Sequence, residues 1–484
     1  MHSFTVPGAL LLLAAAGVPL WAQSADPPPA VTSQRRIAAL EQQVQQLERA
    51  TAALHAEIRA LELSAPIEDP PTAEPASEPA QAAVLLAASV DSLRGSSSVI
   101  SADYPAGALL PASDPPAMGA AAGAAGDLSA WNPFNGMVPI GLLDVYYSYN
   151  EHQPISGLNS LRPFDGQTNQ LALGLLELGV ARQPVAQARL GYRLTGGFGD
   201  SINAVNSSDP GGLGFAQYLH EGYAAYLVPL AHGLRTDVGK FDTAIGAESM
   251  ESPDNWNYSR SFLYNYAVPF YGFGIRPSYA FSDKYAVTGY LVNGWNNLVD
   301  TYSSGKTKGF EFAWRPTQRF QMSEAWLTGR GATEDTQEKT VSDAVARYAV
   351  TSHLALMADA VYGRSEEETP SEAHFFWTGA AAYARYRFNA KWAAAARLEY
   401  YDDHGGLTTC GACAAPTPQD LREATLTGER KVDGHLLGRL EYRYDTSTAP
   451  VFYRAATPIR DQATLTLGLV YMLQSFGAAS NGTR

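Results

Sequence analysis

The sequence has few charged residues, few cysteines and few long apolar runs. Charged side chains make up 17% of the 484 residues, and 48 acidic residues against 34 basic ones give a net charge of -14. A protein that neutralises nucleic-acid phosphates needs a surplus of Lys and Arg, so this balance argues against a nucleic-acid partner. Because its two cysteines are Cys410 and Cys413, the chain must gain its stability from something other than a disulfide framework.

The two cysteines form a CxxC pair with Asp402, Asp403 and His404 nearby. A structural zinc site needs four ligands, and the pair supplies two of them, so a small disulfide on an exposed loop is the favoured interpretation. The sequence contains no G-x-S-x-G, H-E-x-x-H, P-loop or dinucleotide fingerprint. We therefore expect no metal, no cofactor and no enzymatic activity.

One apolar run lies near the N-terminus, where residues 6–18 read VPGALLLLAAAGV. It is too short to span a bilayer, and Ala22 in the following PLWAQ fits the last residue before signal-peptidase cleavage. The preceding MHSFT lacks the usual Lys or Arg, so either the signal is atypical or the start codon is wrongly chosen. We predict a signal peptide over residues 1–22 and an exported protein.

Aromatic residues and glycine, in contrast, are abundant. The 26 Tyr and 43 Gly residues are an unusual composition for an ordinary enzyme. Residues 250–274 (MESPDNWNYSRSFLYNYAVPFYGFG) gather many of the rings, yet Pro, Gly, Asn and Ser interrupt this segment. It can therefore be neither a core helix nor a membrane-spanning one.

Residues 33–63 carry a heptad repeat. The a positions are Ile37, Val44, Thr51 and Ile58, and the d positions are Leu40, Leu47, Leu54 and Leu61. β-Branched a positions with Leu at d favour a parallel dimer, although attachment to a trimeric domain could override that preference. We predict a coiled-coil helix that makes the protein a homo-oligomer, dimer or trimer, followed by a Pro/Ala/Gly-rich linker over residues 64–130.

From about Met137 the hydrophobic pattern has a period of two. In residues 391–401 apolar side chains alternate with Arg397 and Glu399, and residues 435–444 and 463–473 alternate in the same way. Strands of a soluble sandwich average about five or six residues. These segments run for about ten to twelve, which matches a tilted strand that crosses a bilayer.

Tight and long connections alternate along the whole region. The tight ones fall at 182–185, 228–233, 282–284, 315–318, 351–352, 388–390 and 428–433. The long ones run at about 150–170, 196–218, 242–272, 294–306, 329–341, 363–374, 402–421 and 445–460. This alternation predicts an all-β fold, a transmembrane antiparallel up-and-down β-barrel of about 16 strands over residues 137–476. Fourteen strands is the alternative, because Glu423 to Gly428 reads as a weak strand.

Closure into a barrel removes the sheet edges and satisfies the backbone inside lipid. An even number of strands also returns the C-terminus to the side of the N-terminal segment, which we expect to be the periplasm of a bacterial outer membrane. Aromatic residues near strand ends are expected to form girdles at the two membrane interfaces. They are Tyr146, Tyr147, Tyr149, Trp314, Trp326, Trp377, Trp392, Tyr400 and Tyr401.

Two stretches resemble a known family. Residues 235–296, from RTDVGKFDTAIG to YLVNGWN, together with GLLDVYYSYN at Gly141, resemble the bacterial beta-barrel porin 2 family, the OmpL-like porins. The likeness covers roughly the last 350 residues. It implies an outer-membrane pore for small solutes with no catalytic residues, whose partners are lipid and small hydrophilic solutes or ions.

In such a pore, function depends on the residues that face the lumen. An Arg on the lipid face near the midplane costs about 2 to 4 kcal/mol, so the charged side of each strand is expected to face inward. The predicted channel-lining residues are Arg189, Arg193, Arg385, Arg387, Arg397, Glu399, Arg439, Glu441 and Arg443. The alternative is that they pair across strands and have no selective effect.

The third long loop offers acidic partners for these arginines. If this loop folds inward, it would narrow the pore and set up a transverse field that favours polar solutes. The candidate constriction residues are Glu248, Glu251, Asp254 and Arg260.

Two functions remain open at this point. The first is passive diffusion of small hydrophilic solutes or ions through a water-filled channel. The second is an outer-membrane anchor or surface-interaction barrel that uses its coiled coil and loops without significant transport. Steady single-channel conductance would distinguish them.

Overall fold

The computed structural model describes residues 136–207, 216–230, 232–299, 306–330, 338–366, 374–409 and 417–473. The predicted signal peptide (1–22), coiled coil (33–63) and linker (64–130) lie outside these residues, and so do Cys410 and Cys413. The predictions made for these parts of the chain stay predictions.

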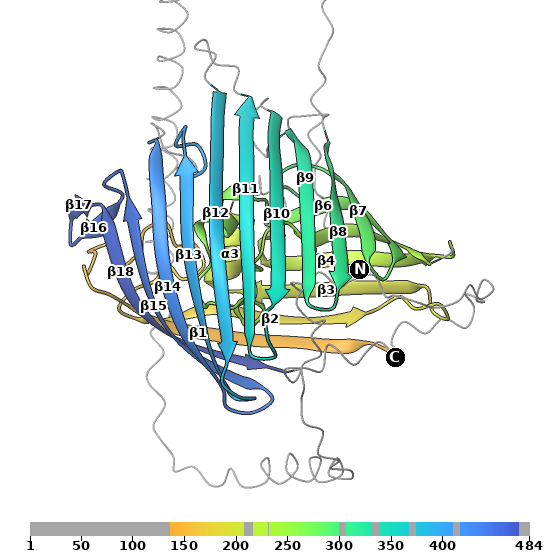
Figure 1. Cartoon of the computed structure of the whole chain (residues 1–484), viewed down its shortest axis with the longest axis horizontal. Coiled ribbons are helices and arrows are strands. Elements are labelled where there is room, and N and C mark those ends of the chain that lie inside the picture. Colours follow the sequence, from red (N-terminus) through yellow and green to blue (C-terminus); the bar gives the residue numbers. More distant parts are fainter. Residues whose placement is uncertain are drawn as a thin grey trace, which may run out of the picture. The chain divides into compact units, whose positions relative to one another are not determined.

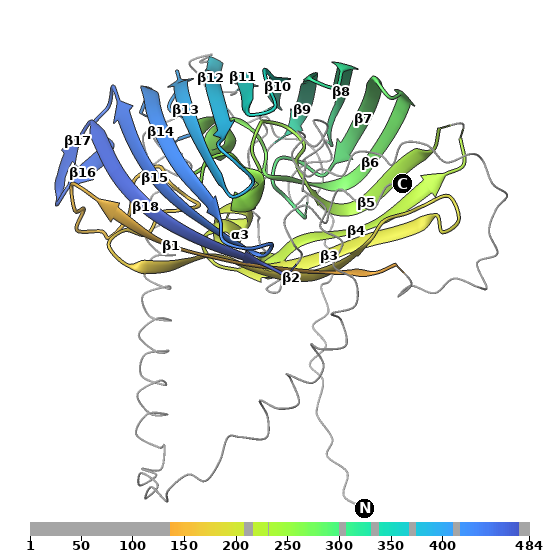
Figure 2. The ribbon, with the colours of Figure 1, turned by 60° about the horizontal axis from the view of Figure 1, so that its bottom comes forward.

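Within the described residues, sixteen antiparallel strands close into a barrel, and β1 pairs with β18 to complete the ring (Figures 1 and 2). The barrel strands are β1 (Val138–Asn150), β2 (Leu171–Arg182), β3 (Leu190–Phe198), β4 (Leu219–Val228), β5 (Leu234–Asp242), β6 (Tyr271–Ser282), β7 (Tyr285–Val292), β8 (Thr307–Thr317), β9 (Phe320–Arg330), β10 (Glu338–Ala349), β11 (Leu354–Glu366), β12 (His374–Arg387), β13 (Trp392–Asp403), β14 (Gln419–Lys431), β15 (Leu436–Ser447) and β18 (Asp461–Met472).

The connections contain short elements of their own. These are α3 (Asp200–Asn206), three shorter helical turns η3 (Ala216–Tyr218), η4 (Ser252–Asp254) and η5 (Leu263–Ala267), and a small hairpin of β16 (Phe452–Arg454) with β17 (Thr457–Ile459). None of the described helices combines the length and the apolar character needed to cross a membrane.

The predicted count of sixteen strands is confirmed, and the alternative of fourteen is wrong. The segment that read as a weak strand lies inside β14, which pairs with β13 from Gln419 to Arg430 and with β15 from Leu421 to Lys431. Its outward side chains include Ala424 and Gly428, which gave little apolar signal. Two complete ladders hold this strand in place regardless of its own hydrophobicity.

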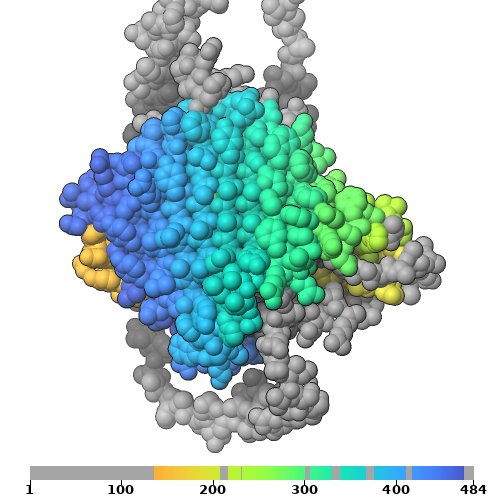
Figure 3. Space-filling model, viewed as in Figure 1, coloured from red at the N-terminus to blue at the C-terminus, as the bar shows by residue number. Residues whose placement is uncertain are grey.

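The alternation of side chains along the strands is also confirmed. On β18, Leu465, Leu467 and Leu469 are exposed on the outer face, whereas Thr464 and Thr466 are buried on the inner one. The outer face over β8–β15 forms a continuous surface without a hollow (Figure 3). Lipid therefore contacts apolar side chains while polar ones point into the barrel.

Several of the proposed girdle positions are wrong. Tyr146, Trp377 and Tyr401 are buried, and the indole N–H of Trp377 donates to the Ala267 carbonyl at 3.1 Å. Since neighbouring residues on a strand point to opposite faces, only one of Tyr400 and Tyr401 could face lipid. Tyr147 and Tyr400, which are the sequence neighbours of Tyr146 and Tyr401, are exposed and lie on the outer face.

One connection matters most for the interior. Residues 243–270, which join β5 to β6 and are called L3 here, lie with α3 inside the ring of strands (Figure 2). Phe262, Leu263, Ala267 and Val268 of L3 are buried in the apolar core of the barrel, together with Phe164 from the first long loop. Residues 262–270, which carry several of the rings in residues 250–274, are thus packed inside the barrel.

Candidate functional site

The candidate site is the contact between L3 and the inner wall of β10–β15, β18 and β1. L3 leaves β5 after Asp242 and returns at Tyr271, and its middle portion lies against strands far away in the sequence. Gly468 on β18 allows this approach, because a Cβ there would come within 2.5 Å of the Tyr258 ring.

Arg397 on β13 makes three hydrogen bonds to L3. Its Nη1 donates to Glu248 Oε1 at 2.6 Å and to the Ser259 carbonyl at 2.7 Å, while its Nε donates to Glu423 Oε1 on β14 at 2.6 Å. The side chain is fully buried. A buried guanidinium needs such partners, because an unpaired charge in this environment is costly.

Two arginines on β15 bind L3 through its backbone carbonyl groups. Arg439 Nη2 donates to the Asn255 carbonyl at 2.7 Å, and Arg443 Nη1 donates to the Arg260 carbonyl at 2.6 Å. Each keeps an ion pair on the wall, with Glu429 and Asp445 respectively. The guanidinium fork lets one side chain do both.

Two glutamates accept hydrogen bonds from successive N–H groups of L3. Glu441 on β15 accepts from the N–H groups of Tyr258 and Ser259 at 2.6 and 3.0 Å. Glu399 on β13 accepts from those of Phe262 and Leu263 at 2.8 and 2.6 Å, at the start of η5. The wall therefore recognises the backbone of L3, with arginines on its carbonyl groups and glutamates on its N–H groups.

The predicted channel-lining residues fall into two groups. Arg397, Glu399, Arg439, Glu441 and Arg443 face inward as the alternation required, but L3 covers them and each is at most 6% exposed. The remaining four, Arg189, Arg193, Arg385 and Arg387, are partly exposed. A role in contacting solute stays a prediction for all nine, and only the second group is accessible to solvent.

The accessible arginines lie at two places, in or next to β3 and at the end of β12. Arg193 on β3 pairs with Glu221, and Arg385 on β12 pairs with Glu429 at 2.5 Å. The other two lie beside tight turns, where Arg189 donates to the Leu227 carbonyl at 3.2 Å and Arg387 to the Ser352 carbonyl at 2.6 Å.

The four candidate constriction residues also differ in exposure. Glu248, Glu251 and Arg260 are buried, and Asp254 on η4 is exposed. Glu248 joins L3 to the wall and also accepts from the Ser261 N–H at 2.6 Å. Arg260 donates to the carbonyl groups of Tyr258 and Met250 within L3. Three of the four therefore hold the loop, and Asp254 is the one that faces solvent.

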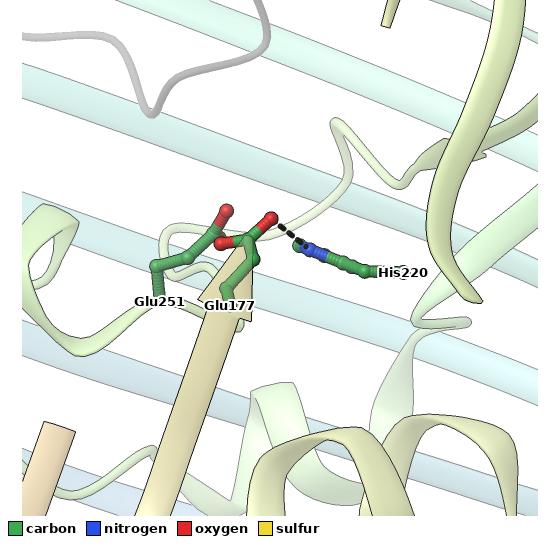
Figure 4. Close-up of side chains that lie close together, drawn as sticks. All are labelled: Glu177, His220 and Glu251. Carbon is green, nitrogen blue, oxygen red and sulfur yellow. Dashed lines mark hydrogen bonds and ion pairs between the residues drawn. The ribbon is translucent and has the colours of Figure 1, made fainter. Parts of the chain in front are cut away.

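A cluster of ionisable groups is formed by Glu177 on β2, His220 on β4 and Glu251 on L3 (Figure 4). His220 on β4 is fully buried, with Nδ1 at 2.8 Å from Glu177 Oε1 and Nε2 at 2.9 Å from Asp242 Oδ2. The donor atoms of Glu177, His220 and Glu251 lie within 4.8 Å of one another, as a metal site would require. Both imidazole nitrogens already face carboxylates, however, so these hydrogen bonds suit a protonated imidazolium.

Glu251 is the L3 residue of this cluster. Burial, opposed by the charge of His220 and reinforced by the carboxylates of Glu177 and Asp242, raises the pKa of Glu251 to about 8. Its carboxyl group also accepts from the Ser249 hydroxyl at 3.0 Å and lies 3.7 Å from Arg193. At neutral pH, L3 thus carries less negative charge than its sequence indicates.

Sequence reasoning missed three carboxyl groups that hold L3. Asp144 on β1 accepts from the Ser252 hydroxyl at 2.6 Å and from the Tyr258 hydroxyl at 2.9 Å. Asp343 on β10 and Asp359 on β11 accept from the N–H groups of Gly246 and Ala247, both at 3.0 Å. Each lies on the inward-facing side of its strand. The alternation along the strand places each of these acids on the inner face, and this was the available signal, because a buried carboxylate on that face needs a partner.

The family comparison identifies the chain. The model of the family described as beta-barrel porin-2, OmpL-like, matches residues 140–473. The chain belongs to this family. The resemblance seen in the sequence is therefore confirmed, and this porin is a channel protein of the outer membrane.

One solved structure agrees on the fold, and a second has a lower TM-score. The anion-selective porin from Comamonas acidovorans is 10% identical, with a TM-score of 0.50, and the match covers 70% of this porin and 99% of that chain. The outer-membrane channel DcaP of Acinetobacter baumannii is 11% identical, with a TM-score of 0.48, and the match covers 72% of this porin and 100% of that chain. No curated relative matches this porin. At such low identity the first likeness shows the barrel fold alone.

Proposed function

We propose that this porin passes small hydrophilic solutes or ions by passive diffusion, and that L3 is the constriction of its channel. The observation that carries the proposal is the fixation of L3: Arg397, Glu399, Arg439, Glu441 and Arg443 all bind it from inside the barrel. A loop bonded to the wall through its own backbone narrows the lumen to a constant width.

Selectivity in this proposal depends on few charges. The charges of Arg397 and Glu248 are paired at 2.6 Å, so they contribute little field in the water-filled space. Among the predicted lining and constriction residues, those that solutes can reach are Asp254 on L3 and the partly exposed Arg189, Arg193, Arg385 and Arg387 on the walls. Solutes are therefore sorted mainly by size and polarity, with a modest preference set by these groups.

The test is single-channel conductance in a planar bilayer before and after deletion of residues 249–259. Removal of the loop tip should raise conductance, because the narrowest segment is lost. Deletion of residues 453–458, the exposed tip of the β16–β17 hairpin, is the control and should leave conductance unchanged, because no hydrogen bond joins this tip to L3 among the described residues. A pore unaffected by the L3 deletion would rule out the constriction, provided that both variants still show the heat-dependent gel shift of a folded barrel.

The orientation in the membrane follows from the loop lengths. We place the tight links and both chain termini in the periplasm, since outer-membrane barrels have short periplasmic turns and longer external loops. Cysteines introduced into the β4–β5 link and into the β16–β17 hairpin would test this with a membrane-impermeant thiol reagent on intact cells. Labelling of the tight link alone would reverse the orientation.

Self-association through residues 33–63 is a further part of the proposal and rests on their heptad repeat. Chemical cross-linking of the protein with and without these residues would reveal whether they set the oligomeric state. An unchanged ladder of cross-linked species would assign assembly to the barrel itself.

The second candidate is an outer-membrane anchor, and the observation that favours it is how much of the interior L3 fills. An anchor would give no steady conductance, so the same bilayer recording decides between the two. In neither case do we infer enzymatic activity, because the buried acids and bases described above are tied to backbone groups or to ion-pair partners.

A further inference from the structure

The beginning of L3 is held by a pair of acids on neighbouring strands. Gly246 has φ +92°, a backbone conformation that glycine adopts without strain, and it turns the chain away from β5 toward β10. Its N–H donates to Asp343 Oδ1 and that of Ala247 donates to Asp359 Oδ2. Arg347 Nη2 donates to the Ala247 carbonyl at 2.9 Å, so both polar groups of Ala247 are bound to the wall.

The two acids lie close together and out of solvent. Asp343 stands opposite Val361 and Asp359 opposite Val345, so they are diagonal neighbours on the inner face. Each is 3% exposed. Their carboxyl groups lie within hydrogen-bonding reach of each other, and Asp343 Oδ2 and Asp359 Oδ1, the oxygens that L3 does not use, receive no hydrogen bond from any described N–H or O–H group.

Such a contact needs one proton. Two ionised carboxylates have no hydrogen to share and repel each other, whereas a carboxylic acid donates to a neighbouring carboxylate. A pair with one proton carries a single negative charge, which the nearby guanidinium of Arg347 can balance. A second negative charge on the pair would have no cation left among the described residues to balance it. Arg397 is already paired with Glu248, and the negative charge of Glu248 itself opposes a further ionisation nearby.

The surroundings support the binding of a proton better than that of a metal ion. The titratable and charged groups around the pair are Arg347 on β10, Tyr383 on β12, Glu248 on L3 and Glu324 on β9. The Tyr383 hydroxyl and Arg347 Nε are buried without a hydrogen-bond partner among the described residues. A metal ion would have to displace the Arg347 cation, whereas a proton does not.

We infer that Asp343 and Asp359 form a shared-proton site that latches the start of L3 to the barrel wall, and that loss of this proton releases the loop. The inference concerns regulation of the constriction and rests on the proposed function for its effect on transport. Its structural part, the latch, is independent of transport. Below the titration range the loop is fixed, and above it the Gly246–Ala247 turn becomes mobile.

The first measurement is hydrogen exchange at the amides of Gly246 and Ala247 in the intact protein, corrected for the intrinsic effect of pH. Between about pH 5 and about pH 9, protection should fall roughly tenfold or more, as expected when one shared proton is lost. Asp343→Asn should remove this dependence, because its amide can donate to Asp359 permanently while its oxygen still accepts from Gly246. Asp359→Asn should act in the same way.

Glu251→Gln is the matched control, since it removes an acid of L3 itself whose pKa, about 8, lies in this range. It should leave the exchange profile of Gly246 and Ala247 unchanged. If this control abolishes the pH dependence, or if Asp343→Asn retains it, the shared proton is not the latch. A response to added calcium or to a chelator at fixed pH would replace the proton with a metal ion and also overturn the inference.

The second measurement is conductance over the same pH range. Release of L3 should make the open level of the wild type noisier and larger at high pH, and Asp343→Asn should stay at the low-pH level. If exchange follows the expected pattern but conductance does not, the latch exists and L3 is not the constriction. If conductance varies with pH while exchange at Gly246 and Ala247 does not, the latch is wrong and the constriction can still hold.

Discussion

The inner faces of β13–β15 and of β2–β6 carry similar charged residues, but these residues bind different partners. On β13–β15, arginines and glutamates direct hydrogen bonds to the backbone of L3. On β2–β6, charged groups mainly pair with one another, as in the contacts of Asp237 with Arg235 at 2.8 Å and with Arg276 at 2.9 Å. The inner face of β13–β15, called the first wall below, therefore fixes a loop. The inner face of β2–β6, called the second wall, is mainly stabilised by ion pairs between its own residues.

This difference shows that charged residues facing the interior of a barrel do not all have the same structural role. A buried ion pair between neighbouring strands mainly offsets the cost of its own burial. A charge on the backbone of a loop, in contrast, fixes the position of a segment that could otherwise leave the lumen. Mutations on the two walls should therefore separate barrel stability from channel behaviour.

The largest effect is expected for Arg397→Met on the first wall. The change leaves Glu248 and Glu423 buried without this cation, and breaking such a pair costs about 3 to 5 kcal/mol. Thermal or urea unfolding in detergent should show this loss, together with noisier conductance. Arg235→Met on the second wall is the comparison. It should destabilise the barrel less, because Asp237 keeps Arg276, and leave channel noise unchanged.

Glu441→Gln should have the next largest effect. The amide oxygen can accept one of the two L3 hydrogen bonds, and the loss of a charged acceptor costs about 1.5 to 3 kcal/mol. Hydrogen exchange at Tyr258 and Ser259 should accelerate, while the strands keep their protection. Equal acceleration throughout the barrel would contradict a role confined to the loop.

A smaller effect is expected from pH through Glu251, the L3 acid that faces the second wall. The pKa of Glu251 is raised from 4.5 to about 8, so its protonated form favours the folded state. This contribution to the free energy of unfolding is complete below pH 4.5 and is lost as the pH rises through about 8. The folded barrel should therefore become less stable, and the pore more cation-selective, as this carboxyl group ionises. Melting temperature and reversal potential between pH 4.5 and 9 would measure both trends, and Glu251→Gln should reduce them.

Asp254→Asn should have the smallest effect on stability, within about 0.5 kcal/mol, because the side chain is exposed. It removes one negative charge from L3 at a point that we propose solutes reach. The reversal potential in a salt gradient should shift toward anions. An unchanged potential combined with unchanged stability would place Asp254 outside the solute path.

The sequence was sufficient to predict the barrel because its signals are local. Alternation along each strand determined which face was polar, as in Arg397 and Glu399 on one side of β13 and Leu398 on the other. Strand β10 shows the limit of such local signals, since it begins at Glu338 inside a stretch predicted to be a loop. Its pairing with β9, from Arg330 onward, extends the ladder through polar residues.

The site was predicted only in part. Inward direction followed from parity for Arg439, Glu441 and Arg443, but their burial did not, because it depends on where L3 runs. The contacts that fix L3 join residues far apart in the chain, such as Ser259 and Glu441, which are 182 residues apart. No pattern within one segment indicates which distant carboxylate will accept a given N–H group.

By itself, then, the sequence determined the period of two, the alternation of tight and long connections and hence a barrel that lipid can surround. The tertiary structure alone decided that L3 occupies the interior, that it covers five of the nine predicted lining residues and that Asp254 remains exposed. The physical reason is that strand pairing and lipid contact select side chains by their position along one strand. The path of a loop is selected by hydrogen bonds to many strands, and these exist only after the barrel has closed.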